Sequence, residues 1–547
     1  MPGSGSCASG AIAGMNHFRV VFQSEGKEVW IHQGATVLEA AGQAGIALVT
    51  PCGGKGICGK CLVELSGSGQ RVPACQYVVD RDLTVRVPST SRFYEQKILA
   101  DGIGRGDRLE ATISERYRRL AGTGEVLGVA VDVGTTTVVA KLVDLSEGRA
   151  LGVEATVNPQ SRFGDDVISR IHYAQSPETL GELQQTIVGC VNELIRKLCE
   201  GAGKDRDSVY EVCLVGNTTM NHLLLGYPVE QLGQAPYRAH SVEAHDVRPE
   251  VLGLVMNGAG NIHTAENIAG FVGSDTTAVA LAVGMDVATE MTLVVDIGTN
   301  GELVVGTGDR LYAASCAAGP ALEGARIRCG SRAAEGAIEA VVIDDGDIGL
   351  DVIGGDVTPR SICGSGLIDA VAVMLELGVI DATGRFASAE EAADRCSEAT
   401  RGRLLEIDGQ GAFCLAFNDG TREAAVVLTQ KDVREFQLAK GAIQAGIRLL
   451  LGKMSIGVGD LEAVLLAGAF GNYIRPSSAV RVGLLPDVPL ERLHFVGNAA
   501  ASGAEMLLLS EACRERSAAL AVRIEYVELA NERDFGTVFA GAMLLCP

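Results

Sequence analysis

Short apolar runs in the first ninety residues predict a small domain built mainly of β-strands. Four runs of this kind cover residues 17–22, 28–31, 62–65 and 83–87. Between the second and the third run, Thr36 and Glu39 have the spacing of a capping box, which predicts a short helix over 37–44. The pattern therefore indicates an α+β domain in which one helix accompanies a small sheet.

From residue 126 onward the pattern changes to longer apolar strands, Gly-Thr turns and amphipathic helices, as is typical of α/β proteins. One stretch also echoes another, since residues 131–137 read VDVGTTT and residues 295–301 read VDIGTNG. Each places an aspartate at the end of an apolar strand, followed by Gly-Thr and a second apolar run. Two related half-domains that face one another would produce this echo.

The length of the chain and one linker-like stretch predict several domains. At 547 residues it is too long for one compact core. Residues 89–125 are charged and punctuated by glycine, which predicts a linker. We expect a first domain at 15–88, the linker at 89–125, a middle domain or first half at 126–205 and a C-terminal region at 206–547. Residues 1–14 read as an extension or as a mis-assigned start.

Composition excludes several classes of partner. A formal net charge of −22 argues against binding to nucleic acid or to an anionic membrane surface. No run of about 20 apolar residues predicts a transmembrane helix, and the N-terminus is a poor match to a signal peptide. We therefore expect a cytoplasmic protein whose 15 cysteines are mostly reduced. A bound nucleotide would have to be held locally, by backbone amides and a metal ion.

Four cysteines near the N-terminus carry the first chemical signal. They are spaced Cys52-x5-Cys58-x2-Cys61-x13-Cys75. Three closely spaced cysteines with a fourth downstream are typical of a [2Fe–2S] ferredoxin, because two irons need four thiolates and one loop can supply three of them. Glycines in that loop let it bend and direct N–H groups at the sulfurs. The flanking strands and helix fit the β-grasp fold of such domains.

Zinc and a disulfide knot are the alternatives at this site. A C-x2-C pair alone does not separate zinc from an iron–sulfur cluster. Zinc ribbons, however, have two such pairs, whereas Cys75 stands alone here. The spacing therefore favours the cluster over both alternatives.

The second chemical signal is the Asp-x-Gly-Thr turn that occurs twice. Such a hairpin lets backbone N–H groups and threonine hydroxyls bind a phosphate, while the aspartate can hold Mg²⁺ directly or through water. One copy would be weak evidence, because hairpin turns favour these residues anyway. Two copies are stronger, and residues 464–472 (VLLAGAFGN) add a strand that runs into a glycine-rich turn. An adenosine ring can pack on backbone of this kind.

These three elements, in this order, resemble the phosphate-1, phosphate-2 and adenosine motifs of the acetate/sugar kinase–Hsp70–actin superfamily. Together with the cysteine domain, the chain resembles the reductive activators of corrinoid proteins. Further stretches that carry the resemblance are 158–170, 215–220, 363–366, 429–433 and 438–443. The resemblance implies a multidomain fold. An N-terminal α+β β-grasp [2Fe–2S] ferredoxin domain and a linker precede an α/β actin/Hsp70-like ATPase with two ribonuclease-H-like half-domains.

The resemblance also implies an activity and roles for individual residues. An ATP-hydrolysing activator would take an electron from a low-potential donor onto its [2Fe–2S] cluster and reduce Co(II) to Co(I) in the corrinoid protein of a methyltransferase system. Asp132 and Asp296 would hold Mg²⁺ or its water. The residues that would cradle the phosphates are Gly134, Thr135, Thr136, Gly298, Thr299 and Asn300, and those that would flank adenosine are Gly468, Gly471 and Asn472. A homodimer is a further expectation.

Other functions and simpler structural roles stay open at this point. A metabolite kinase with a regulatory ferredoxin domain, or an ATP-gated redox sensor, would carry the same motifs. An activator of 2-hydroxyacyl-CoA dehydratases is disfavoured, because its cluster bridges two subunits. Asn217 is as readily a helix cap as a nucleotide contact, Cys363 reads as part of a strand-to-helix turn, and Glu302 either orients a water or metal or is structural.

Overall fold

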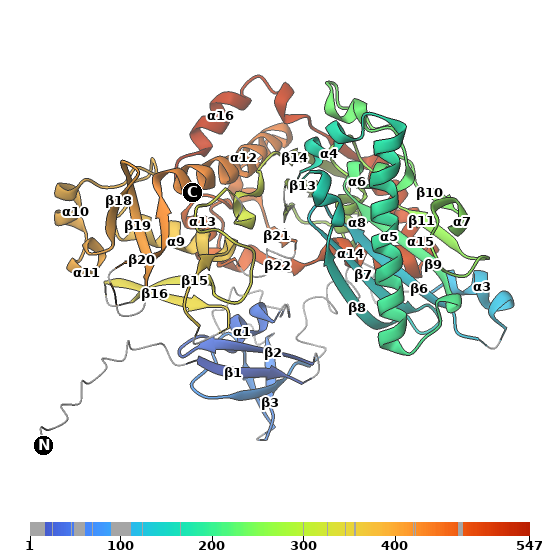
Figure 1. The fold of residues 1–547 in the computed structure, drawn as a ribbon, viewed down its shortest axis with the longest axis horizontal. Helices are drawn as coiled ribbons and strands as arrows, with labels where there is room; N and C mark the ends of the chain where they lie inside the picture. The colour runs from blue at the N-terminus through green and yellow to red at the C-terminus, as the bar shows by residue number, and fades with distance from the viewer. Residues whose placement is uncertain are drawn as a thin grey trace, which may run out of the picture. The chain divides into compact units, whose positions relative to one another are not determined.

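The computed structural model describes most of the chain (Figure 1). The described residues are 17–23, 26–44, 46, 48, 61–67, 69–88, 111–122, 124–164, 166–298, 300–324, 326–344, 346–354, 357–418, 421, 423–468 and 474–546. They form two compact units, one made of residues 1–92 with 324–433 and the other of residues 93–323 with 434–547. None of the helices described combines the length and the apolar character needed to cross a bilayer.

In the residues that the structure describes, the N-terminal domain has a five-stranded mixed sheet and helix α1 (Val37–Gln43). Its strands are β1 (His17–Phe22), β2 (Lys27–His32), β3 (Leu62–Leu65), β4 (Gln70–Pro73) and β5 (Leu83–Arg86), in the order β2-β1-β5-β3-β4. Helix α1 begins at Thr36, whose hydroxyl accepts from the Glu39 N–H while the Glu39 carboxylate accepts from the Thr36 N–H. The predicted strands and the capping box are therefore confirmed.

In the rest of the first unit, the described residues of 324–433 form two small three-stranded sheets, three complete helices and the start of helix α12 (Gln430–Met454). The elements are β15 (Ala337–Asp344), β16 (Asp347–Val352), β17 (Ser361–Ile362), α9 (Gly364–Glu376), α10 (Ala389–Arg395), α11 (Glu398–Arg401), β18 (Leu404–Ile407), β19 (Gln410–Phe417) and β20 (Ala424–Thr429). Cys363 is the N-cap of α9, directly after β17. A Cβ on Gly366 would lie 2.3 Å from the Ile338 carbonyl oxygen, so the turn is close-packed, as predicted from the sequence.

The first large sheet of the second unit has six strands. They are β6 (Leu127–Val133), β7 (Thr137–Asp144), β8 (Arg149–Val157), β9 (Val209–Gly216), β10 (His245–Val247) and β11 (Asn261–Thr264), in the order β10-β11-β9-β6-β7-β8. The long helix α5 (Pro177–Ala202) packs on β7 and β8. It does so through a buried apolar stripe that includes Leu183, Ile187, Val191 and Leu194, spaced three or four residues apart.

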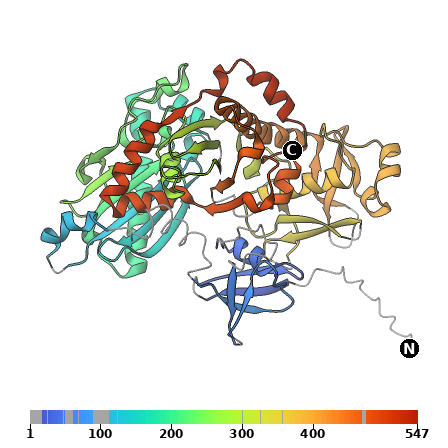
Figure 2. The ribbon, with the colours of Figure 1, turned by 180° about the vertical axis from the view of Figure 1, so that it is seen from behind.

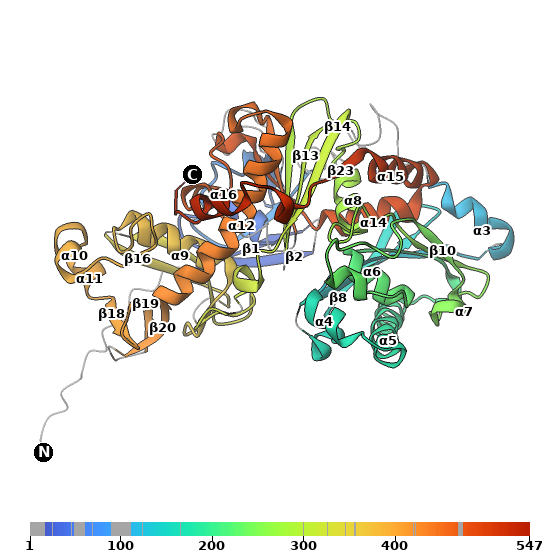
Figure 3. The ribbon, with the colours of Figure 1, turned by 90° about the horizontal axis from the view of Figure 1, so that it is seen from above.

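The second large sheet repeats the arrangement of the first. Its strands are β12 (Thr292–Ile297), β13 (Gly301–Thr307), β14 (Arg310–Cys316), β21 (Ala463–Ala467), β22 (Leu493–Gly497) and β23 (Ile524–Tyr526), in the order β22-β21-β12-β13-β14-β23. Figure 3 labels three of these strands, β13, β14 and β23. Both sheets contain a meander of three antiparallel strands, and a further strand, β9 or β21, is added in parallel on the other side of the first strand of that meander. The echo in the sequence therefore reflects two related half-domains.

The first half-domain continues past residue 205, where the sequence suggested a boundary. Helix α5 ends at Gly203, which has a left-handed backbone (φ 65°) that reverses the chain. Strand β9 then begins at Val209 and lies beside β6 in the same sheet. Residues 126–205 are thus one part of a sheet that extends to β11, because α5 is a crossover within the sheet and not the end of a domain.

Two helices bring the ends of the half-domains together. Helix α8 (Ser274–Ala282) follows β11, and helix α14 (Ala499–Leu509) follows β22. They pack closely on each other, since a Cβ on Gly503 would lie 2.2 Å from the Ala278 carbonyl oxygen. Helix α14 also lies against β6 and β9, as the red helices over the teal strands show from behind (Figure 2).

The described end of the expected linker is anchored to the second unit. Helix α3 (Ile113–Ala121) carries Tyr117, whose hydroxyl donates to the fully buried carboxylate of Glu211 on β9. Arg514, on α15 (Glu511–Arg523), donates to the same carboxylate over 2.7 Å. Because a buried charge needs partners, Arg514 and Tyr117 both stabilise the Glu211 carboxylate, and the bond from Tyr117 ties α3 to the sheet.

Candidate functional site

Two of the four predicted cluster cysteines are described, and they lie together. Cys61 immediately precedes β3, and Cys75 follows β4 in the neighbouring turn. Both are buried, and their Sγ atoms are 3.3 Å apart. The Ala74 N–H donates to the Cys61 carbonyl over 2.8 Å, which ties the two cysteine segments to each other. Cys52 and Cys58 lie outside the described residues.

The pair fits a shared metal better than a disulfide. A disulfide bond is about 2.05 Å long, so two thiols 3.3 Å apart are unbonded to each other. Converging thiolates at the rim of a β-grasp sheet are the donor set that an iron–sulfur cluster requires. Apolar side chains pack around them, including Val63 and Val79. Cys61 and Cys75 would therefore hold one side of a [2Fe–2S] cluster.

The second unit gathers four carboxyl groups where its two half-domains meet. Asp132 and Asp296 occupy matching places near the ends of β6 and β12. Glu302 lies directly opposite Asp296 on β13. Asp275, in the first turn of α8, is the fourth member. The repeated motif thus places its two aspartates in one site.

Burial raises the pKa of all four groups, and repulsion between carboxylates adds to the rise for Asp132, Asp296 and Glu302. Burial, then repulsion by Asp275, raises the pKa of Asp296 to about 7. The same causes raise the pKa of Asp132 to about 7, against a hydrogen bond from Asn498 Nδ2 to Asp132 Oδ2 of 3.3 Å. Burial also raises the pKa of Asp275, and the pKa of Glu302 is raised well above its usual value by burial and by repulsion from Asp275 and Asp296. Such a cluster favours a bound cation.

Mg²⁺ fits this cluster when phosphate supplies the remaining ligands. Across the residues that the structure describes, no three metal-ligating side chains converge closely enough to bind a metal by themselves. Mg²⁺ usually keeps several waters and binds through one or two carboxylates together with substrate phosphates. Asp132 and Asp296 are therefore suited to hold a hydrated Mg²⁺ that also contacts a nucleotide.

The first Gly-Thr turn is a tight loop beside this cluster. The Gly134 N–H donates to the Thr137 carbonyl over 3.0 Å, and a Cβ on Gly134 would lie 2.6 Å from that oxygen. Thr135 is buried, and its hydroxyl accepts from Asn217 Nδ2 over 2.9 Å. Asn217 also caps helix α6 (Thr218–Leu225). The same residue therefore serves as a helix cap and as a contact of the Gly-Thr turn.

The second Gly-Thr turn follows Asp296, and Gly468 lies against the same residue. The Gly298 N–H donates to the Asn300 carbonyl over 2.9 Å, and Thr299 lies outside the described residues. Gly468 follows β21 with φ of 94°, and a Cβ there would lie 2.8 Å from Asp296 Oδ1. Only glycine avoids both the strained backbone and this clash. Gly471 and Asn472 lie outside the described residues.

Asp275 and Asn498 are members of the site for which the sequence analysis gave no signal. Each lies at the start of a helix that follows a strand: Asp275 in the first turn of α8, after β11, and Asn498 at the N-cap of α14, after β22. A signal for Asn498 exists in hindsight, because Val496-Gly-Asn498 repeats the Val215-Gly-Asn217 pattern that precedes a capped helix. Asp275 has no such marker, since an acidic residue in the first turn of a helix is common for local reasons.

Family comparisons agree with the three regions of the chain. The model of a 2Fe-2S iron-sulfur cluster binding domain matches residues 18–90. The RACo middle region matches residues 127–288, and the C-terminal domain of RACo, the ASKHA domain, matches residues 290–547. These matches confirm the expected order of a ferredoxin-like domain followed by an actin/Hsp70/sugar-kinase-like ATPase.

Whole-chain relatives point the same way. The corrinoid activation enzyme RamQ of Eubacterium limosum is 33% identical, over 94% of this chain and 97% of the relative. The [Co(II) methylated amine-specific corrinoid protein] reductase of Methanosarcina barkeri is 26% identical over 70% of each chain. A solved reductive activator for corrinoid, iron-sulfur protein is 30% identical with a TM-score of 0.69, over 96% of this chain and 98% of the other. The chain therefore belongs to the RACo family of reductive activators.

Proposed function

We propose that this chain is an ATP-dependent reductive activator of a corrinoid protein, returning cobalt from Co(II) to Co(I). The observation that supports this best is the end-to-end match to RamQ, together with two chemical sites in one chain. One site is the buried cysteine pair, and the other is the carboxyl cluster between two Gly-Thr turns. A bound [2Fe–2S] cluster would supply single electrons at low potential.

The residues of the carboxyl cluster divide the work of nucleotide binding. Asp132 and Asp296 hold Mg²⁺ or its waters, while Asp275 completes the negative field. The phosphates lie between the first turn (Gly134, Thr135, Thr136) and the second (Gly298, Thr299, Asn300). Adenosine lies against the turn that Gly468 opens and that continues to Gly471 and Asn472. Since these groups belong to both half-domains, a bound nucleotide couples their positions.

Coupling of the half-domains by the nucleotide can help an electron transfer that is uphill in free energy. Plant-type clusters have potentials of about −400 mV. The family resemblance implies a lower potential for the Co(II)/Co(I) couple of the corrinoid protein, so the electron transfer is uphill. A gap of ~120 mV lowers a one-electron equilibrium constant about 100-fold. Tighter binding of the Co(I) state than of the Co(II) state by roughly 2.7 kcal/mol offsets such a gap. A nucleotide-dependent change in how the activator grips its partner is suited to provide this difference.

The effect of pH on Mg²⁺ binding follows from the raised pKa values of Asp132 and Asp296. Between about pH 4 and 7 the folded protein retains protons that the unfolded chain releases, so the metal-free protein loses stability as the pH rises. Mg²⁺ binds the ionised carboxylates and reverses that trend. We expect the rise in melting temperature caused by MgATP, relative to ATP with EDTA, to be larger at pH 8 than at pH 5.5. Differential scanning fluorimetry measures it, and an increment independent of pH would contradict these Mg²⁺ ligands.

Anaerobic reduction of a corrinoid protein tests the function directly. The reduced activator is mixed with Co(II) corrinoid proteins, with and without MgATP, while the cobalt absorption spectrum is followed. We expect Co(I) to appear only when MgATP is present. Full reduction without nucleotide would remove ATP from the electron step. If no corrinoid protein were reduced while ATP and the cluster stayed bound, the metabolite kinase and the redox sensor would take precedence.

A further inference from the structure

Three successive carbonyl groups of the first Gly-Thr turn are held by one neighbouring motif. Asn158 Nδ2 donates to the Gly134 carbonyl over 2.8 Å, and the Asn158 N–H donates to the Thr136 carbonyl over 2.9 Å. Between them, Arg170 Nη2 donates to the Thr135 carbonyl over 2.6 Å. Residues Asn158 and Arg170 of the 158–170 motif therefore hydrogen-bond to the carbonyl groups of Gly134, Thr135 and Thr136.

These hydrogen bonds fix the direction of the backbone N–H groups in the turn. In a planar trans peptide the carbonyl and the N–H of one unit point in opposite directions. Because the carbonyls of Gly134 and Thr135 point at the motif, the N–H groups of Thr135 and Thr136 point away from it. These are donors of the kind that bind phosphate oxygens at glycine-rich turns. The motif thus decides which way the donors of the turn face.

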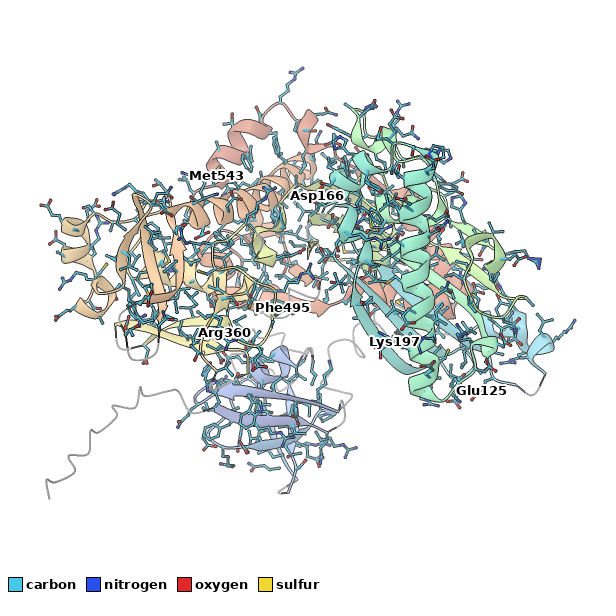
Figure 4. All side chains as sticks on the ribbon, in the orientation of Figure 1. Glu125, Asp166, Lys197, Arg360, Phe495 and Met543 are labelled. Carbon is cyan, nitrogen blue, oxygen red and sulfur yellow. The ribbon has the colours of Figure 1, made fainter. Side chains whose placement is uncertain are left out.

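The motif is built to keep the Arg170 guanidinium fixed. Arg170 is fully buried, and its Nε donates to the Gly164 carbonyl over 2.9 Å. A Cβ on Gly164 would lie 2.6 Å from the Ser169 Cβ, so the chain can close around the guanidinium only with glycine there. Asp166 (labelled in Figure 4) caps helix α4 (Val167–Tyr173), which carries Arg170. A buried guanidinium held by several acceptors has little freedom to move.

We propose that Arg170 and Asn158 are positioning residues that hold the first turn with its N–H groups facing the phosphates of ATP. Neither residue touches the nucleotide, and both act through the carbonyls of the turn. The inference rests on the proposed nucleotide-binding function. It adds a role for residues 158–170 that binding of the adenosine group does not require, so the affinity for adenosine is an internal control.

The test compares binding of MgATP and of adenosine to the full-length protein by calorimetry. Arg170→Met removes the donors but keeps an apolar side chain of similar length. We expect it to weaken MgATP binding roughly 10- to 100-fold, the range for a lost charge-assisted hydrogen bond, and to leave adenosine binding unchanged. Arg170→Lys, which keeps one charged donor, should fall between. Arg162→Met is the matched control, because Arg162 belongs to the same motif but donates to Thr186 and not to the turn.

Each outcome separates the positioning role from alternatives. Equal losses of MgATP and adenosine affinity would assign Arg170 a purely structural role and overturn the inference. The inference also fails if Arg170→Met behaves like Arg162→Met. If Arg170→Met does not fold, Asn158→Ala carries the test, since it removes the side-chain donor to Gly134 and a cap, and it must show the same selective loss. A wild-type protein that binds MgATP no better than adenosine would overturn the nucleotide function itself.

Discussion

Replacing Asp296 with asparagine is expected to abolish ATP turnover while the visible spectrum of the iron–sulfur cluster stays unchanged. Asp296 lies opposite Glu302 on β13 and against Gly468, where both half-domains reach the carboxyl cluster. Asparagine keeps the shape of the side chain but removes one of the charges that we propose to hold Mg²⁺. A metal ion contributes several kcal/mol to a phosphoryl-transfer transition state, so turnover should fall at least about 100-fold. Phosphate release measured with the corrinoid partner present reports it.

Stability distinguishes this effect from misfolding. Because repulsion and burial oppose ionisation of Asp296, the asparagine variant should be at least as stable as the wild type without metal. Asp309→Asn is the matched control, since Asp309 is exposed in the turn between β13 and β14, within the same meander. It should keep full turnover. Retained turnover in Asp296→Asn, or loss of the cluster spectrum together with turnover, would contradict the assignment.

The features that the sequence predicted well are those that local chemistry dictates. The capping box at Thr36 and Glu39 needs only residues that are three apart, and the structure contains it with both hydrogen bonds. The repeated Asp-x-Gly-Thr turn needs only a hairpin, and both copies are antiparallel hairpins at matching places in two sheets. Because the motif is written twice in one chain, the sequence alone suffices to pair Asp132 with Asp296.

The features that could not be predicted depend on contacts between distant segments. Asp275 joins the carboxyl cluster only because α8 packs on α14, and nothing in its own neighbourhood marks it as different from other acidic residues at helix starts. Arg170 was part of a matching stretch, yet its contact with the Thr135 carbonyl appears only once α4 folds back onto the turn between β6 and β7. The boundary near residue 205 likewise depended on whether the next strand joins the same sheet.

Replacing Cys75 with alanine is expected to give the opposite result to Asp296→Asn. The Sγ atoms of Cys75 and Cys61 converge to 3.3 Å, as two ligands of one cluster do. A [2Fe–2S] cluster needs four thiolates, so three cannot hold it stably. The variant should lose its iron and the visible absorption, and reduction of Co(II) should fall to background. ATP turnover should persist, because the carboxyl cluster belongs to the other unit of the chain.

Iron content, visible absorption and phosphate release on one preparation decide the matter. Cys190→Ala is the matched control, since Cys190 is a half-buried thiol on α5 and should leave iron content unchanged. Zinc in place of iron in wild-type protein prepared without oxygen would revive the zinc alternative. If Cys75→Ala kept both iron and Co(II) reduction, the fourth ligand would lie elsewhere. Loss of iron and of Co(II) reduction with ATP turnover intact is the expected result, and it would assign the electron and the nucleotide to separate sites.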